Sequence, residues 1–94
     1  MKVGLLTLQY RLIGINSLKE KRSIVKRLLG NVRGCGPAYA VAEVACQDSL
    51  RRMTIRVAHL SNDLQYTDSV LSRLRERLSK GCGYEAIDAS IEDL

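Results

Sequence analysis

The chain is predicted to be α+β, a ferredoxin-like βαββαβ sandwich in which two helices cover one face of a four-stranded antiparallel sheet. Two stretches with helical spacing are each flanked by stretches that alternate between apolar and polar residues, the period of a strand. Only a few residues separate the two middle strands, as in a hairpin. This order is that of two split βαβ units. With 94 residues there is room for one core, so residues 1–94 are expected to form a single domain.

The first unit comprises a strand over residues 2–12 and a helix that begins at Ser17 and ends near Gly34. The alternation within the strand is typical of a half-buried strand. Ser17 opens the sequence S-L-K-E, a capping box in which the hydroxyl accepts from a first-turn amide and Glu20 reaches back. The apolar residues that recur at helical spacing are Leu18, Ile24, Val25, Leu28, Leu29 and Val32. Gly34 and the proline beyond it stop the helix.

Residues 39–47 and 52–60 are predicted to be two antiparallel strands joined by a turn at 48–50. Glu43 interrupts the first of them, and a carboxylate in the middle of a strand needs a partner. We expect Glu43 to pair with Arg56 of the neighbouring strand on the open face of the sheet, in preference to a catalytic role.

The second unit comprises a helix that is predicted to begin at Asn62, with Gln65 in the capping-box position, and to end at Gly81. Its apolar stripe consists of Val70, Leu71, Leu74 and Leu78. A final strand is expected over residues 84–91. A G-C-G tripeptide follows each helix; because glycine suits the left-handed residue that closes a helix, the repeat indicates shared geometry and not a shared thiol site.

Composition and charge are those of a globular protein with one positive side. The chain is 46% hydrophobic and 27% charged, and no apolar run approaches the roughly 18 residues that would span a bilayer. The amino-terminal stretch lacks the cleavage pattern of a signal peptide, so we expect a cytoplasmic location and no membrane partner. All fifteen basic residues lie at or before Lys80, whereas Glu85, Asp88, Glu92 and Asp93 lie in the last ten positions.

No motif predicts catalysis. The glycine patterns of nucleotide phosphate loops are absent. Ser23 and Lys26 form an S-x-x-K without the companion motifs of a serine hydrolase, and the single histidine, His59, has no acid or nucleophile partner. Arg11 and Gly14 supply only part of the phosphate loop of acylphosphatases. We therefore predict no enzyme activity and no catalytic residue, with a phosphate-ester hydrolase acting through Arg11 as a remote alternative.

The three cysteines predict no metal site and no cofactor. Cys35, Cys46 and Cys82 do not form a C-x-x-C pair, and His59 is the only other soft ligand. A structural zinc site usually requires four such ligands at characteristic spacings. We expect ordinary thiols in a reducing compartment.

The strongest functional signal is the basic surface of the two helices. The predicted nucleic-acid contacts are Lys19, Arg22, Lys26 and Arg33 on the first helix and Arg73, Arg77 and Lys80 on the second. The first four lie within about 60° of one another on a helical wheel. Such stripes can neutralise phosphates and release counterions. The alternative is an ordinary solvated helix face, and because the helices are expected to be antiparallel, the two stripes need not merge.

The open face of the sheet is a competing site. RNA-recognition motifs stack bases on aromatic residues of this face, but the chain has no Phe and no Trp and lacks their glycine–aromatic signature. We expect Val3, Leu5, Tyr39 and Val41 to leave a partly apolar open face instead. Such a face suits a partner, a small ligand or a second copy of the chain.

Three stretches, SLKEKRSIVKRLL at 17–29, VAEVACQD at 41–48 and VAHLSND at 57–63, resemble the YlxP-like family of small bacterial proteins. The resemblance runs nearly end to end, and SLKEKR is its most specific block. It implies a ferredoxin-like fold, no established activity, and gene neighbourhood with translation-initiation and ribosome-maturation factors. A ribosome- or RNA-associated role is inferred for relatives on that basis. Relatives often carry an aromatic residue just after the Q-D pair, near the position of Leu50 in this chain.

Two hypotheses from different classes follow. The first is a non-enzymatic accessory factor that binds structured RNA or the ribosome through its basic helix face. The second is a dimeric assembly module or a small-ligand-sensing module that acts through its open sheet face.

Overall fold

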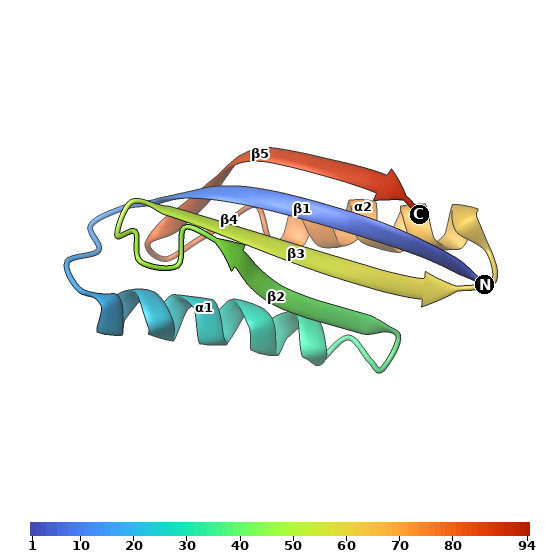
Figure 1. Ribbon diagram of the computed structural model, residues 1–94, viewed down its shortest axis with the longest axis horizontal. Helices are drawn as coiled ribbons and strands as arrows, with labels where there is room; N and C mark the ends of the chain where they lie inside the picture. The colour runs from blue at the N-terminus through green and yellow to red at the C-terminus, as the bar shows by residue number, and fades with distance from the viewer.

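The computed structural model describes residues 1–94, with a sheet on one side and two helices on the other (Figure 1). The elements are β1 (Lys2–Leu12), α1 (Leu18–Arg33), β2 (Tyr39–Ala45), β3 (Arg52–Ser61), α2 (Leu64–Arg77), β4 (Lys80–Gly81) and β5 (Tyr84–Asp93). The predicted α+β class and the order of its long strands and helices are therefore confirmed. Neither helix is long and apolar enough to cross a bilayer.

The sheet has five strands in the order β2-β3-β1-β5-β4, and all paired neighbours are antiparallel. Its four long strands have the ferredoxin-like arrangement, with β1 and β3 in the centre. The prediction of four strands is wrong because the chain adds the two-residue β4. Residues 80–85 form a tight hairpin with Gly83 at φ +89°, and the ring of Tyr84 covers Gly81 so closely that a Cβ would collide with it. Glycine is therefore required at both positions.

The hydrophobic core lies between one sheet face and the inner faces of the helices. Leu6, Leu8 and Tyr10 of β1 are fully buried and pair with Val57, Ile55 and Met53 of β3. The helices contribute Ile24, Leu28, Val32, Leu71 and Leu74. Burial of each such side chain stabilises the fold by about 1.5–3 kcal/mol. The buried hydroxyl of Tyr10 donates to the carbonyl of Leu78 at 2.7 Å, which satisfies this polar atom within the core.

The two helices begin at side-chain caps. Ser17 caps α1 as predicted, because its Oγ accepts from the amide of Glu20 at 3.1 Å. The cap of α2 is Asp63, whose carboxylate accepts from the amide of Gln65 at 3.0 Å. The prediction that Asn62 is the N-cap is wrong by one residue. Ser61, Asn62 and Asp63 can all serve as N-caps, so the sequence alone does not select among them.

The orientation of β2 differs from the predicted one. Tyr39, Val41 and Glu43 point toward the helices, and the alanines between them lie on the open face. The prediction that Tyr39 and Val41 belong to the open face is therefore wrong, as is the predicted pair of Glu43 with Arg56. Both faces of this strand carry apolar residues, so alternation alone does not select the inner face. The bulkier tyrosine and valine bury more apolar surface than the alanines, which favours the observed orientation.

The helices cover different strands. Figure 1 shows α1 beside β2 at one edge of the sheet and α2 behind β1 and β5, in agreement with the contacts between these elements. Gly4 lets α2 approach β1 closely: a Cβ at this position would lie 2.5 Å from Cγ2 of Thr67 and 2.8 Å from Cδ1 of Leu71. The lateral separation of the helices determines where their basic residues lie.

Candidate nucleic-acid interface

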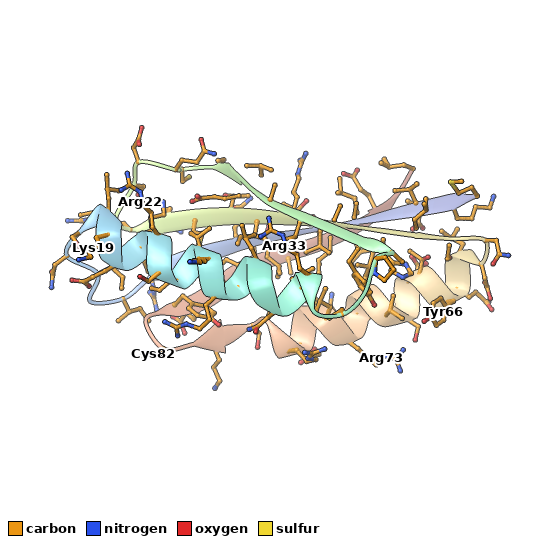
Figure 2. All side chains as sticks on the ribbon, turned by 90° about the horizontal axis from the view of Figure 1, so that it is seen from below. Lys19, Arg22, Arg33, Tyr66, Arg73 and Cys82 are labelled. Carbon is orange, nitrogen blue, oxygen red and sulfur yellow. The ribbon has the colours of Figure 1, made fainter.

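Four exposed side chains of α1, those of Lys19, Arg22, Lys26 and Arg33, form a surface that we call the α1 basic face. The buried stripe that includes Ile24 lies on the other side of the helix, in contact with the core. Figure 2 shows Arg22 and Arg33 on the same side of α1 and Lys19 near its first turn. The structure therefore brings these four predicted residues together.

The α1 basic face is not neutralised by acids of the protein. The ion pairs of the chain are Arg11–Glu85 and Lys21–Glu43, and neither includes a residue of this face. Four of the ten acids lie on β5 instead, and β5 and β2 are on opposite sides of the two central strands. An unpaired cluster of like charge creates a positive potential that attracts polyanions.

The three basic residues predicted on the second helix lie on two different elements. Arg73 and Arg77 are exposed on the flank of α2 that faces the end of α1, and Nη1 of Arg77 lies 3.8 Å from Sγ of Cys35. Figure 2 shows Arg33 near the end of α1 and Arg73 at the outer edge of α2, so the two stripes do not merge into one row. Lys80 is not on the helix: α2 ends at Arg77 and Lys80 lies on β4 across from Glu85, because the chain turns there into the hairpin.

Arg51 and Arg52 are functional candidates that the sequence reasoning missed. Together with Arg11 they line the largest hollow of the surface, about 500 Å³, between residues 14–16 and the turn before β3. The hydroxyl of Ser49 accepts from the amides of both arginines at 3.1 Å, which orders the turn. In the sequence, the R-R dipeptide that follows the predicted turn at 48–50 could have indicated these two residues.

Lys21, on the inner side of α1, is almost completely buried. Its Nζ lies 3.3 Å from Oε2 of Glu43 and donates to the carbonyl of Cys46. Cys46 has φ +61°, a left-handed conformation that is uncommon for residues other than glycine. The buried ammonium group therefore holds the loop after β2 against the first turn of α1.

Three aromatic rings lie between α2 and β2. The ring centroids of Tyr39 and His59 are 4.6 Å apart, and those of His59 and Tyr66 are 5.8 Å apart. Nδ1 of His59 is 3.0 Å from Oγ1 of Thr67, and burial lowers the pKa of His59, which favours the neutral imidazole. Burial also raises the pKa of Tyr39, an effect that the nearby Arg73 partly opposes.

The residues considered as catalytic or metal-binding candidates have other contacts. Oγ of Ser23 donates to the carbonyl of Lys19 at 3.3 Å and so is engaged away from Lys26. The cysteines are all free thiols, and no three His, Cys, Asp or Glu side chains lie close enough to hold a metal ion. What this surface offers chemically is fixed positive charge.

These features define the class of protein: a small ferredoxin-like α+β domain whose first helix exposes a row of basic residues. The chain matches, over residues 3–91, the family described as protein of unknown function (DUF503), and it belongs to that family. A search of curated proteins found no match.

Two designed proteins are similar to the chain among solved structures. De novo designed protein Foldit4 has a TM-score of 0.57 and 12% sequence identity, over 100% of this chain and 97% of that one. De novo designed protein LFR1 1, described as having a ferredoxin fold, has a TM-score of 0.49 and 14% identity, over 100% of this chain and 83% of that one. At this level of identity, the similarity to the first design concerns the fold alone.

Proposed function

We propose that the chain is a non-enzymatic accessory factor that binds structured RNA, free or within the ribosome, through the α1 basic face. The observation that supports this proposal best is that Lys19, Arg22, Lys26 and Arg33 are exposed together with no acid in ion-pair distance. Exposed like charges at this spacing repel each other modestly in water, and phosphate groups that meet them relieve this repulsion and release counterions.

The length and rigidity of the face also support RNA as the partner. Lys19 and Arg33 are fourteen residues apart on one helix, about 21 Å along its axis, so the face can follow several successive phosphates. Lys21 anchors the first turn of this helix to β2. The turn that carries Arg51 and Arg52 follows the same anchored loop, so these two arginines extend the proposed contact surface.

The finer family assignment and location belong to the same proposal. We infer that the chain is a YlxP-like member of the DUF503 family and acts beside the translation machinery in the cytoplasm. The three sequence blocks that resemble YlxP-like proteins motivate this assignment. Cosedimentation with ribosomes from a cell lysate, with and without nuclease, tests the proposed association with the translation machinery.

Charge reversal of the α1 basic face tests the main proposal. We expect the combined change Lys19→Glu, Arg22→Glu and Lys26→Glu to weaken binding to an RNA hairpin at least about tenfold. Because about three phosphate contacts are lost, the slope of log K against log salt should become shallower by about 2–3. Fluorescence anisotropy titrations at two salt concentrations measure both quantities.

A matched variant controls for net charge. Lys2→Glu, Arg56→Glu and Arg75→Glu make the same change in charge at positions outside the α1 basic face, and this control should retain most of the affinity and the salt slope. Circular dichroism and urea unfolding check that both variants are folded. If the α1 variant binds the hairpin and cosediments with ribosomes as well as the parent, the face is not the contact.

A second candidate function is self-association or ligand binding through the open sheet face. Two adjoining apolar hollows of about 280 and 230 Å³ lie on this side of the sheet and share Ala40 and Ala58. Val3 and Leu60 pair across β1 and β3 at the end of this patch, and Leu60 is 42% exposed. A partly apolar patch on a sheet is a surface that a second copy can cover.

A further inference from the structure

A groove of about 360 Å³ runs between α2 and the end of α1, outside the α1 basic face. Tyr66 and Tyr39 contribute aromatic rings to it, Arg73 and Arg77 contribute guanidinium groups, and Cys35 contributes a thiol. The groove is therefore the one place on the surface where aromatic rings and unpaired cations line the same hollow.

Tyr66 presents an open aromatic surface to this groove. It is 54% exposed, whereas Tyr10 and Tyr84 are buried in the core. His59 lies against Tyr66 and Tyr39 lies against His59, so the exposed ring is supported from behind by two others. A supported, exposed ring loses little conformational freedom when a planar group stacks on it.

The charge beside this ring is positive and unpaired. Arg73 follows Tyr66 by seven residues and Arg77 follows Arg73 by four, so all three project from one flank of α2 over about 16 Å. Neither arginine has an acid in ion-pair distance, and the one polar neighbour of Arg77 is the thiol of Cys35. Planar guanidinium groups match the geometry of phosphate oxygens.

We propose that this groove takes one unpaired nucleotide of the bound RNA, with its base stacked on Tyr66 and its phosphates bound to Arg73 and Arg77. This inference rests on the proposed function, because it assigns a second contact to the same RNA. The α1 basic face contacts the phosphates of the paired region, and the groove selects an RNA with a bulged or looped-out residue. A nucleotide fits because it joins a planar ring to an anion, as the groove joins Tyr66 to two cations.

The test compares a hairpin that carries one bulged nucleotide with the same hairpin fully paired. Stacking on one aromatic side chain predicts a preference of about 5- to 100-fold for the bulged RNA. Tyr66→Ala should remove this preference and leave binding to the paired hairpin unchanged, whereas Tyr66→Phe should keep it. Arg73→Ala with Arg77→Ala should weaken binding of the bulged hairpin, whereas Arg75→Ala, on the other flank of α2, is the control and should not.

A chemical readout reports occupation of the groove itself. In a Cys46→Ser, Cys82→Ser background, Cys35 is the single remaining thiol, and the bulged hairpin should slow its alkylation more than the paired hairpin does. Equal affinity for the two hairpins, or a preference that survives Tyr66→Ala, overturns the groove assignment and leaves the α1 basic face intact. Failure to bind either hairpin overturns the proposed function together with this inference.

Discussion

Lys21 links three segments of the chain through one buried ammonium group. It belongs to the SLKEKR block, whereas Glu43 and Cys46, its two partners, belong to the VAEVACQD block. These sequence blocks therefore meet in a structural contact that joins α1, β2 and the loop after β2. A buried pair of this kind is a weak source of net stability but is costly to break, because removal of one partner leaves the other charge buried and uncompensated.

We predict that Lys21→Met destabilises the protein by about 3–5 kcal/mol, since the carboxylate of Glu43 is 16% exposed and would lose its cation. The carbonyl of Cys46 would lose its donor as well. Urea unfolding followed by circular dichroism measures the loss.

A second variant keeps this prediction testable if the first does not fold. Lys21→Met combined with Glu43→Leu replaces both charges by apolar groups and should recover most of the stability. Lys26→Met, on the exposed side of the same helix, should change the free energy of unfolding by about 0.5 kcal/mol or less. A cost for Lys21→Met as small as that of Lys26→Met would show that the pair is solvated.

The two flanks of α2 carry different charged residues. One flank carries Arg73 and Arg77 beside the groove. The other carries Asp68, whose Oδ1 is buried without a hydrogen-bond partner. The neighbouring carboxyl group of Asp93, which can accept a hydrogen bond from protonated Asp68, raises the pKa of Asp68; burial and the negative charge of Asp93 act in the same direction. This contact ties α2 to β5.

The raised pKa of Asp68 predicts a pH dependence of stability. The folded state holds this proton more tightly than the unfolded state, so the contribution of Asp68 is fully present below its ordinary pKa of 3.8 and is lost as the pH rises through the raised value. Asp68→Asn, which keeps a donor toward Asp93 without the charge, should therefore raise the urea midpoint at pH 7. The gain should shrink as the pH falls below 3.8.

Asp88→Asn is the matched control for this measurement, because Asp88 is an exposed acid of β5 with no ion-pair partner. Its effect on the urea midpoint should be small and nearly the same at both pH values. A destabilising effect of Asp68→Asn at pH 7 would mean that the carboxylate, and not the carboxylic acid, is the form that the fold prefers.

The whole molecule is electrically asymmetric. The acids Glu85, Asp88, Glu92 and Asp93 follow one another on β5, and α1 lies beside β2 at the other side of the sheet (Figure 1). The acids at the end of the sequence therefore lie across the width of the sheet from the α1 basic face, on the side where α2 carries its own arginines. Such a separation orients the molecule as it approaches a polyanion, with the α1 basic face leading.

Self-association through the open sheet face predicts the oligomeric state of the whole molecule. If a second copy covers the apolar patch around Leu60, light scattering should give the mass of a dimer, and Leu60→Glu should convert it to a monomer. Ser90→Glu, a charge placed on β5 away from the patch, is the control and should leave the dimer intact. A chain that stays monomeric at high concentration would leave this second candidate without support.

Periodicity predicted most elements because it reports which residues a helix or a strand buries. The alternation over residues 2–12 indicated that β1 is half-buried, and the capping box at Ser17 indicated the start of α1. The inner face of β2 could not be read, because alanine and valine are apolar on both sides of that strand. The prediction that Lys80 lies on the second helix is wrong because the chain turns into a hairpin there. The contact between Tyr84 and Gly81 that accompanies this hairpin joins residues of different elements, so it could not be read from local spacing.

By itself the sequence determined the long strands and the two helices, their ferredoxin-like order, and the uneven distribution of charge along the chain. These depend on local spacing and on composition, which a linear chain carries completely. Only the tertiary structure decided that Lys21 is buried against Glu43, that Arg51 and Arg52 line a hollow with Arg11, and that Tyr39 and Cys35 lie beside the arginines of α2. Each of these depends on how close two elements come in space, and that distance is set by packing between layers.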